Sequence, residues 1–212
     1  MLTAILAVTM TVPDLAAVER AYGDYLGYRV VERGEVAAEL AELWGAPALA
    51  GREFLLMQPA SGAPVYLRAI RQDAHPGFAA MRTHGWNSNE ILVEDNYAIH
   101  ERLKDSPFRI IGEPKGLSMN PEVIAMQALG PAEELVYLTR IPPGKSLFNL
   151  GSAQSFVDRT FIVVLGGPDM EAMRGFYAGL GMPVTEPMDA TISVLSKAWG
   201  LPPEHQFKLG IV

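Results

Sequence analysis

Residues 13–28 read PDLAAVERAYGDYLGY, and residues 168–182 read PDMEAMRGFYAGLGM. Both stretches begin with Pro-Asp, carry an aromatic side chain near the middle and reach Leu-Gly near the end. An Asp before the first helical turn accepts hydrogen bonds from the free backbone N–H groups there, and Gly is a common residue just past a helix end. Each stretch therefore predicts one capped helix, and the two together predict an internal repeat.

The sequence around the first copy extends this pattern into a larger unit. Residues 2–12 alternate between two faces, as expected for a strand, and Asp14 follows directly as the helix cap. Further strands are predicted after the helix, with a short helix inserted after the second strand: residues 28–34 (strand), 36–45 (helix), 52–59 (strand) and 65–72 (strand). The first unit is therefore predicted to be βαβββ.

The same order of elements returns twice. In the second unit, Asp95 or Asn96 caps the helix, and the predicted elements are residues 88–95 (strand), 96–106 (helix), 108–114, 123–129 and 134–141 (strands). A third unit begins with a predicted strand at residues 160–167. The distance along the sequence from Asp14 to Asp169 equals the distance from Trp44 to Trp199. Its inserted helix is expected in residues 190–200 and its third strand in residues 205–212, and no fourth strand is predicted.

These repeats predict an α+β fold with three segments. Residues 1–141 are expected to form one complete cup of two βαβββ units, residues 142–159 a linker, and residues 160–212 a partial third unit. Because a three-strand unit leaves sheet edges open, we expect the native chain to continue past Val212. The alternative is a homodimer in which two third units pair.

Composition narrows the class of protein. Of the 212 residues, 49% are hydrophobic and 19% are charged, which is typical of a globular protein with a sizeable core. A net charge of −7 argues against nucleic acid or an anionic membrane as the partner, and the absence of cysteine excludes disulfides and thiolate metal sites. The apolar N-terminal segment lacks the basic start of a signal peptide, and no apolar run reaches the roughly 18 residues of a membrane span. We therefore expect a cytoplasmic protein.

The repeated motif resembles that of the vicinal oxygen chelate superfamily, which includes glyoxalase I, bleomycin-resistance proteins and extradiol dioxygenases. The resemblance lies in VPDL…YLGY at residues 12–28, GPDM…FYAGLGM at residues 167–182 and, more weakly, VEDNYAIHERL at residues 93–103. It implies that two units pair into a curved, half-open barrel, with helices outside and ligand and metal inside the cup.

The resemblance also implies one divalent metal, held by His, Glu or Gln side chains from the first and last strands of the paired units. The matching positions here hold Ala7, Ser88, Ile162, Tyr66 and Tyr137. None of these side chains is a competent metal ligand at neutral pH, and Glu90 alone would hold a metal poorly. We therefore expect no metal and no other cofactor.

Candidate site residues lie on the mixed strand faces. A carboxylate in a partly apolar cup has a raised pKa and can act as a general base, an arginine can hold a carboxylate or phosphate, and a tyrosine can stabilise an oxyanion. The expected catalytic residues are Glu90, Tyr66, Arg68 and Tyr137, and the expected ligand-binding residues are Thr9, Trp86, Gln127 and Met126. We expect Glu90 and Arg68 to come close together, and a purely structural ion pair between them is the alternative.

The favoured function is that of a metal-independent enzyme acting on a small-molecule ligand. It would perform proton abstraction, isomerisation or C–C cleavage on an oxygenated, aromatic or apolar compound, as a lyase or isomerase rather than a dioxygenase. Two alternatives stay open: a non-catalytic, ligand-sequestering protein of the bleomycin-resistance type, and an extradiol dioxygenase-like protein with a degenerate metal site.

Overall fold

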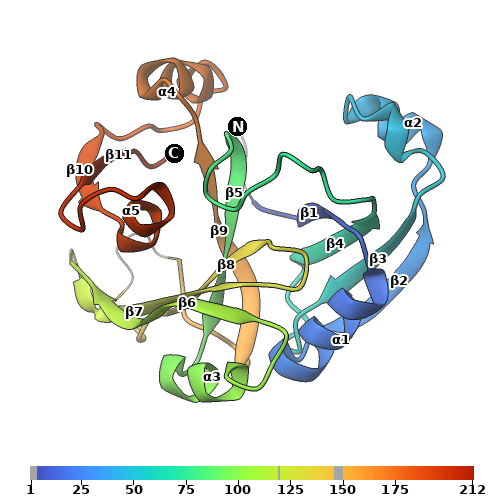
Figure 1. Cartoon of the computed structure of the whole chain (residues 1–212), viewed down its shortest axis with the longest axis horizontal. Coiled ribbons are helices and arrows are strands. Elements are labelled where there is room, and N and C mark those ends of the chain that lie inside the picture. The colour runs from blue at the N-terminus through green and yellow to red at the C-terminus, as the bar shows by residue number, and fades with distance from the viewer. Residues whose placement is uncertain (1–3, 119, 146–149) are drawn as a thin grey trace.

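A computed structural model describes residues 4–118, 120–145 and 150–212 (Figure 1). Within these residues the strands form a four-stranded, a five-stranded and a two-stranded sheet. No helix in the described part of the chain is long and apolar enough to cross a membrane. Together, these sheets and the helices between their strands make a mixed α+β structure built from βαβββ repeats, as the sequence predicts.

The first unit forms the four-stranded sheet, in the order β1-β4-β3-β2 with β1 parallel to β4. Its elements are β1 (Ala7–Val12), α1 (Leu15–Leu26), β2 (Arg29–Glu35), α2 (Ala38–Leu43), the 3-10 turn η1 (Pro47–Leu49), β3 (Glu53–Gln58) and β4 (Tyr66–Arg71). Val8 and Met10 of β1 pack against the core beneath α1, whereas Thr9 is exposed. The predicted alternation of this strand is confirmed.

The three repeated aspartates begin the long helices. The Asp14 carboxylate accepts a hydrogen bond from the backbone N–H of Ala17 at 3.0 Å. Asp95 and Asp169 make the equivalent bonds at the starts of α3 (Asn96–Leu103) and α4 (Met170–Gly179). Gly27 ends α1 with a φ of 72°, a conformation that costs a side chain with a Cβ atom roughly 1 kcal/mol or more. The sequence motif thus corresponds to a capped helix in each unit.

The second unit forms most of the five-stranded sheet. Its strands are β5 (Gly85–Val93), β6 (Arg109–Leu117), β7 (Asn120–Leu129) and β8 (Leu135–Arg140), and β9 (Val157–Gly166) of the third unit completes the order β6-β7-β8-β5-β9. β9 begins earlier than the expected residue 160, because Val157 pairs with Val93 of β5.

The pairing of the units differs from the expectation. β5 pairs with β9 in antiparallel register, with Glu90 opposite Ile162, so the second and third units share one sheet. In the described residues β1 pairs only with β4. The first two units therefore do not join edge to edge. All three first strands have similar alternating patterns, so periodicity alone could not identify which two would pair.

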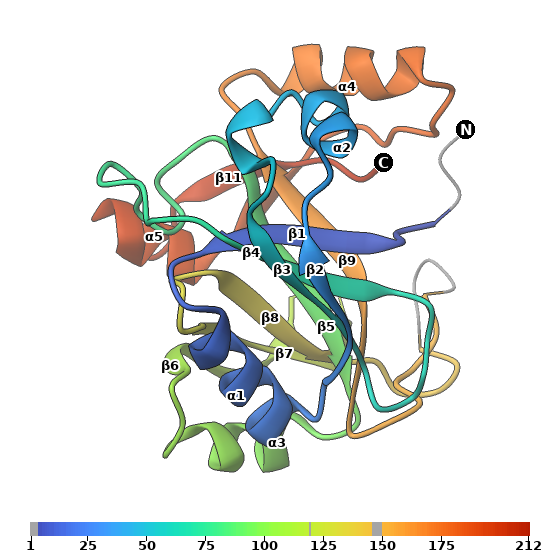
Figure 2. The ribbon, with the colours of Figure 1, turned by 90° about the vertical axis from the view of Figure 1, so that its right-hand side faces the viewer.

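The first and second units instead meet through their helix-covered faces (Figure 2). Tyr22 of α1 is fully buried, and its ring makes edge-on contacts with Tyr28 and Phe108. Its hydroxyl donates a 3.0 Å hydrogen bond to Glu134 in the turn before β8. Burying one large apolar side chain stabilises a fold by roughly 1.5–3 kcal/mol, so this shared core fixes the two sheets relative to each other.

The third unit adds α4, β10 (Met188–Thr191), α5 (Ser193–Trp199) and β11 (Gln206–Leu209). β10 and β11 form the separate two-stranded sheet. α5 lies against β6 with Val194 and Ser196 buried, and Trp199 Nε1 donates a 2.8 Å hydrogen bond to the Met81 carbonyl. α5 is thus attached to the segment between β4 and β5.

Candidate functional site

One row of side chains crosses the five-stranded sheet on the side away from α3. In register, Gly112 of β6 lies opposite Gln127 of β7, Gln127 opposite Tyr137 of β8, Tyr137 opposite Glu90 of β5, and Glu90 opposite Ile162 of β9. Residues opposite each other in neighbouring strands point to the same side of a sheet. We call this surface the Glu90 face.

The strands place their other side chains in the helix-side core. Ile91 of β5 and Leu138 of β8 are fully buried there. The predicted register, with Ser88 and Tyr137 on the side opposite Ile91, is therefore confirmed. Met126 is also fully buried in this core, which corrects its assignment as a ligand contact. Met126 and Gln127 are neighbours in one strand, so their side chains must point to opposite faces.

Glu90 is the chemically unusual group in the row. Its side chain keeps only part of its accessible surface, and burial raises the pKa of its carboxyl group to about 7. Within residues 4–118, 120–145 and 150–212 it makes no ion pair and no side-chain hydrogen bond. A carboxyl group with this pKa is partly ionised near neutral pH, so it can both accept and return a proton.

Tyr137 and Gln127 carry the other polar groups of the row. Burial, together with the nearby negative charge of Glu90, raises the pKa of Tyr137 well above its ordinary value, so its hydroxyl stays protonated. Gly112 leaves room for the Gln127 amide, because a Cβ atom at that position would overlap Gln127 Oε1 and crowd Val194 of α5. Like Glu90, both side chains lack a hydrogen-bond partner within the described residues.

Apolar groups surround this row. Leu92, two residues after Glu90 in β5, lies on the same face. It is buried in a cluster with Val123 and Ile141, and Leu150 and Phe161 pack against this cluster. On another side, α5 places Val194 over Gly112 and Gln127. Trp86, near the start of β5, is 66% exposed. Sequence analysis missed Gly112 and Val194, because no motif connects a helix of the third unit to a strand of the second.

The remaining predicted residues lie on the other large sheet. Thr9 and Arg68 are opposite each other in β1 and β4, and Tyr66 is opposite Ala7. The Arg68 guanidinium is stacked over the ring of Trp44, 5.2 Å from its centroid, and does not pair with Glu90. The expected Glu90–Arg68 pair is therefore not formed. β4 and β5 are consecutive strands, but they belong to different sheets.

Two surface hollows, of ≈ 390 and ≈ 730 Å³, lie elsewhere, beside α1. Charged side chains such as Glu19 contribute to both, and neither contains a residue of the Glu90 row. Because they combine open shape with exposed charges, we place the candidate site on the Glu90 face instead.

The donor atoms on the Glu90 face do not fit the divalent metal implied by the family resemblance. Glu90 is flanked by Tyr137 and Ile162, and the described residues contain no group of three or more His, Cys, Asp or Glu side chains that could hold a metal. His100 lies instead on α3, where its Nε2 atom is 2.6 Å from Glu113. A single carboxylate without a nitrogen ligand binds such metals weakly.

We expect the purified protein to retain much less than one Mn²⁺, Ni²⁺ or Zn²⁺ ion per chain after incubation and desalting. Elemental analysis by mass spectrometry measures this directly, with a chelator-treated sample as the control. One retained ion per chain that the Glu90→Gln variant fails to retain would contradict this expectation.

Comparison with known proteins gives matches among solved structures alone. No family model matches the chain, and no curated protein does. Glyoxalase I from Zea mays is 16% identical with a TM-score of 0.59, and the match covers 88% of this chain and 58% of the maize protein. The chain therefore spans little more than half the length of that enzyme.

Two shorter structures match as well. A glyoxalase family protein from Bacillus cereus is 18% identical with a TM-score of 0.52, over 66% of this chain and 94% of that protein. A glyoxylase/bleomycin resistance protein/dioxygenase domain from Frankia is 16% identical with a TM-score of 0.52, over 68% of this chain and 96% of that domain. At such identities the likeness shows the fold alone, and this chain shares the fold of these glyoxalase-family structures.

Proposed function

We propose that the Glu90 face binds a small, oxygenated, largely apolar compound and that Glu90 removes a proton from a carbon next to a carbonyl group of that compound. One observation carries the proposal. In the part of the chain that the structure describes, three polar side chains, Glu90, Tyr137 and Gln127, stand in one row without a hydrogen-bond partner, on a face that also carries Ser88, Thr139 and the apolar Leu92. Partly buried polar groups normally find partners, so an unpartnered row is best completed by a ligand.

Each side chain has a role that its environment supports. In the reaction the C–H bond breaks, the proton moves to the Glu90 carboxylate, and the electron pair moves toward the carbonyl oxygen. The protonated Tyr137 hydroxyl donates a hydrogen bond to that developing oxyanion, and the Gln127 amide donates one to a second oxygen of the compound. In an α-hydroxy ketone, the hydroxyl proton then moves to the former carbonyl oxygen and Glu90 returns its proton to the former carbonyl carbon. The carbonyl and hydroxyl groups thereby exchange places, and this isomerisation balances without an oxidant or reductant.

The apolar surroundings matter for the same chemistry. Leu92 is buried in a cluster against which Phe161 packs, Val194 lies beside Gly112, and burial is the cause of the raised pKa of Glu90. A base with a pKa near the working pH combines a useful fraction of carboxylate with a useful proton affinity. An isomerase is therefore favoured over a protein that only sequesters its ligand, which would have no use for such a base.

A suitable probe is 2-hydroxyacetophenone, an aromatic ketone whose CH₂ protons lie next to the carbonyl group. In D₂O we expect the protein to accelerate the exchange of these protons for deuterium. The rate should rise as the pH passes through about 7 and then level off, because only the ionised carboxyl group accepts a proton. Loss of the CH₂ signal in proton NMR spectra measures the rate.

Buffer without protein gives the background rate at each pH. Saturable binding of the ketone without exchange at any pH would favour the ligand-sequestering alternative and contradict the proposed reaction. Exchange with a rate that does not change between pH 5 and pH 9 would exclude Glu90 as the base.

A further inference from the structure

Arg68 has an unusual environment on the four-stranded sheet. Its guanidinium lies over two aromatic rings, 5.2 Å from the centroid of Trp44 and 5.9 Å from that of Phe54. Trp44 follows α2, and Phe54 belongs to β3. Cation–π contacts hold a guanidinium in place through its flat face, so they leave the N–H groups at its edge available.

These N–H groups have no acceptor in the described part of the protein, where Arg68 makes no hydrogen bond and no ion pair. Other arginines of this chain do pair with carboxylates: Arg33 with Glu19, Arg109 with Glu133, Arg159 with Asp158 and Arg174 with Glu171. Glu32 is on the same face, separated from Arg68 by Leu56 in the register, and does not reach it. Arg68 is half-buried, so an unpaired charge here has a desolvation cost that an anion would offset.

Two hydroxyl groups stand beside this cation. Thr9 lies directly opposite Arg68 in β1, and Tyr66 precedes Arg68 by one strand repeat in β4, so all three side chains point to the same side. Thr9 is exposed, and neither hydroxyl donates a hydrogen bond within the described residues. Trp44 remains 38% exposed, which leaves part of its ring surface for a further contact. We call this surface the Arg68 face.

We infer that the Arg68 face is a second binding site, separate from the Glu90 face, and that its ligand is an aromatic carboxylate. The guanidinium edge matches the two oxygens of a carboxylate, with the Thr9 and Tyr66 hydroxyls as further donors. The ring of the ligand packs against the exposed part of Trp44 and against Leu56. This ligand does not suit the Glu90 face, because the ionised Glu90 would repel a carboxylate.

Sodium benzoate is the probe, and isothermal titration calorimetry at low ionic strength measures its binding. Acetate carries the same anionic group without a ring, and inorganic phosphate carries a different anion without a ring. We expect benzoate to bind more tightly than either. Arg68→Met, which keeps an apolar stem over Trp44, should weaken benzoate binding by about tenfold or more, because it removes a charge-assisted pair of hydrogen bonds.

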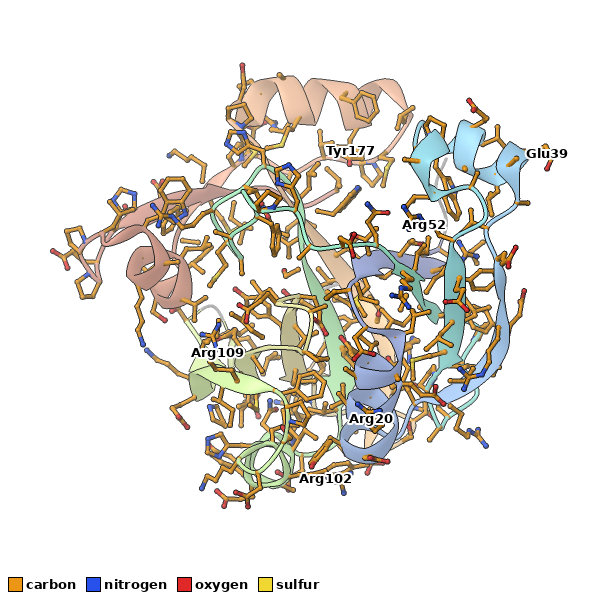
Figure 3. All side chains as sticks on the ribbon, turned by 45° about the vertical axis from the view of Figure 1, so that its right-hand side comes forward. Arg20, Glu39, Arg52, Arg102, Arg109 and Tyr177 are labelled. Atoms are coloured by element: carbon orange, nitrogen blue, oxygen red, sulfur yellow. The ribbon has the colours of Figure 1, made fainter. Side chains whose placement is uncertain are left out.

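Arg20→Met is the matched control, since it removes the same charge. Arg20 is exposed on α1, on the opposite side of this sheet (Figure 3), so benzoate affinity should stay at the wild-type value. No benzoate binding by the wild type, or equal losses in the two variants, would overturn the proposal. Equal affinities for benzoate, acetate and phosphate would also overturn it, because the rings would then contribute nothing.

Thr9→Val provides a second test that does not disturb the contact between Arg68 and Trp44. It should weaken benzoate binding severalfold without changing the thermal unfolding temperature, whereas a purely structural role for Arg68 predicts no change in binding.

Discussion

Glu90→Gln will slow the exchange of deuterium into 2-hydroxyacetophenone by at least about 100-fold, the lower end of the usual contribution of a general base. The amide has the size and shape of the carboxylic acid but cannot accept the proton. Binding of the ketone should change little, because Tyr137 and Gln127 still donate to its oxygens. Proton NMR spectra recorded in D₂O at pH 8 give the two exchange rates and the two affinities.

The matched control is Glu39→Gln, which makes the same change of charge on the exposed surface of α2 (Figure 3). Its exchange rate should equal that of the wild type. If Glu90→Gln exchanged deuterium at the wild-type rate, Glu90 would not be the base and the proposed reaction would be wrong. If the ketone no longer bound to this variant, Glu90 would be a binding residue and the catalytic role would be refuted.

The same substitution will also raise the free energy of unfolding at pH 8 but leave it almost unchanged at pH 4. The pKa of Glu90 is about 7 in the folded protein, against 4.5 for an unperturbed carboxyl group. Below pH 4.5 the group is protonated in both the folded and the unfolded chain, so its burial carries no ionic cost. As the pH rises from about 4.5 to about 7, the folded wild type loses stability relative to the unfolded chain, by roughly 3 kcal/mol in total.

Gln cannot ionise, so the variant avoids this loss. Urea unfolding of both proteins at several pH values measures the difference, which should grow between pH 4.5 and pH 7 and then stay constant. Glu39→Gln should show no such dependence, because its side chain is exposed in the folded and unfolded chains alike. A difference between Glu90→Gln and wild type that did not vary with pH would mean that Glu90 ionises normally, which would also remove the physical basis of its role as a base.

Within the described residues, neither Glu90 nor Arg68 has an ion-pair partner. The sequence predicts that the two side chains lie close together, whereas the structure places them on different sheets. The single site expected from the sequence is therefore divided into two faces. The Glu90 face carries a base with two hydrogen-bond donors, and the Arg68 face carries a cation between aromatic rings.

Local sequence determined the elements of this protein and the direction of their side chains. Asp14, Asp95 and Asp169 each begin a helix because a short carboxylate satisfies backbone N–H groups only a few residues away. Alternation along a strand likewise assigned Ile91 to the core and Glu90 to the opposite face. The same rule, applied to adjacent residues, would have excluded Met126 once Gln127 was placed in the site.

Only the tertiary structure decided which strands and faces come together. Hydrogen bonds between strands involve the backbone, which is alike in every strand, so the pairing of β5 with β9 could not be inferred from side-chain patterns. The environment of Glu90 depends on that pairing, and the far end of its row, at Gly112, is packed by Val194 of α5, which comes from a distant part of the chain. Its pKa reflects how much protein surrounds the carboxyl group, and that surrounding exists only after the second and third units have assembled.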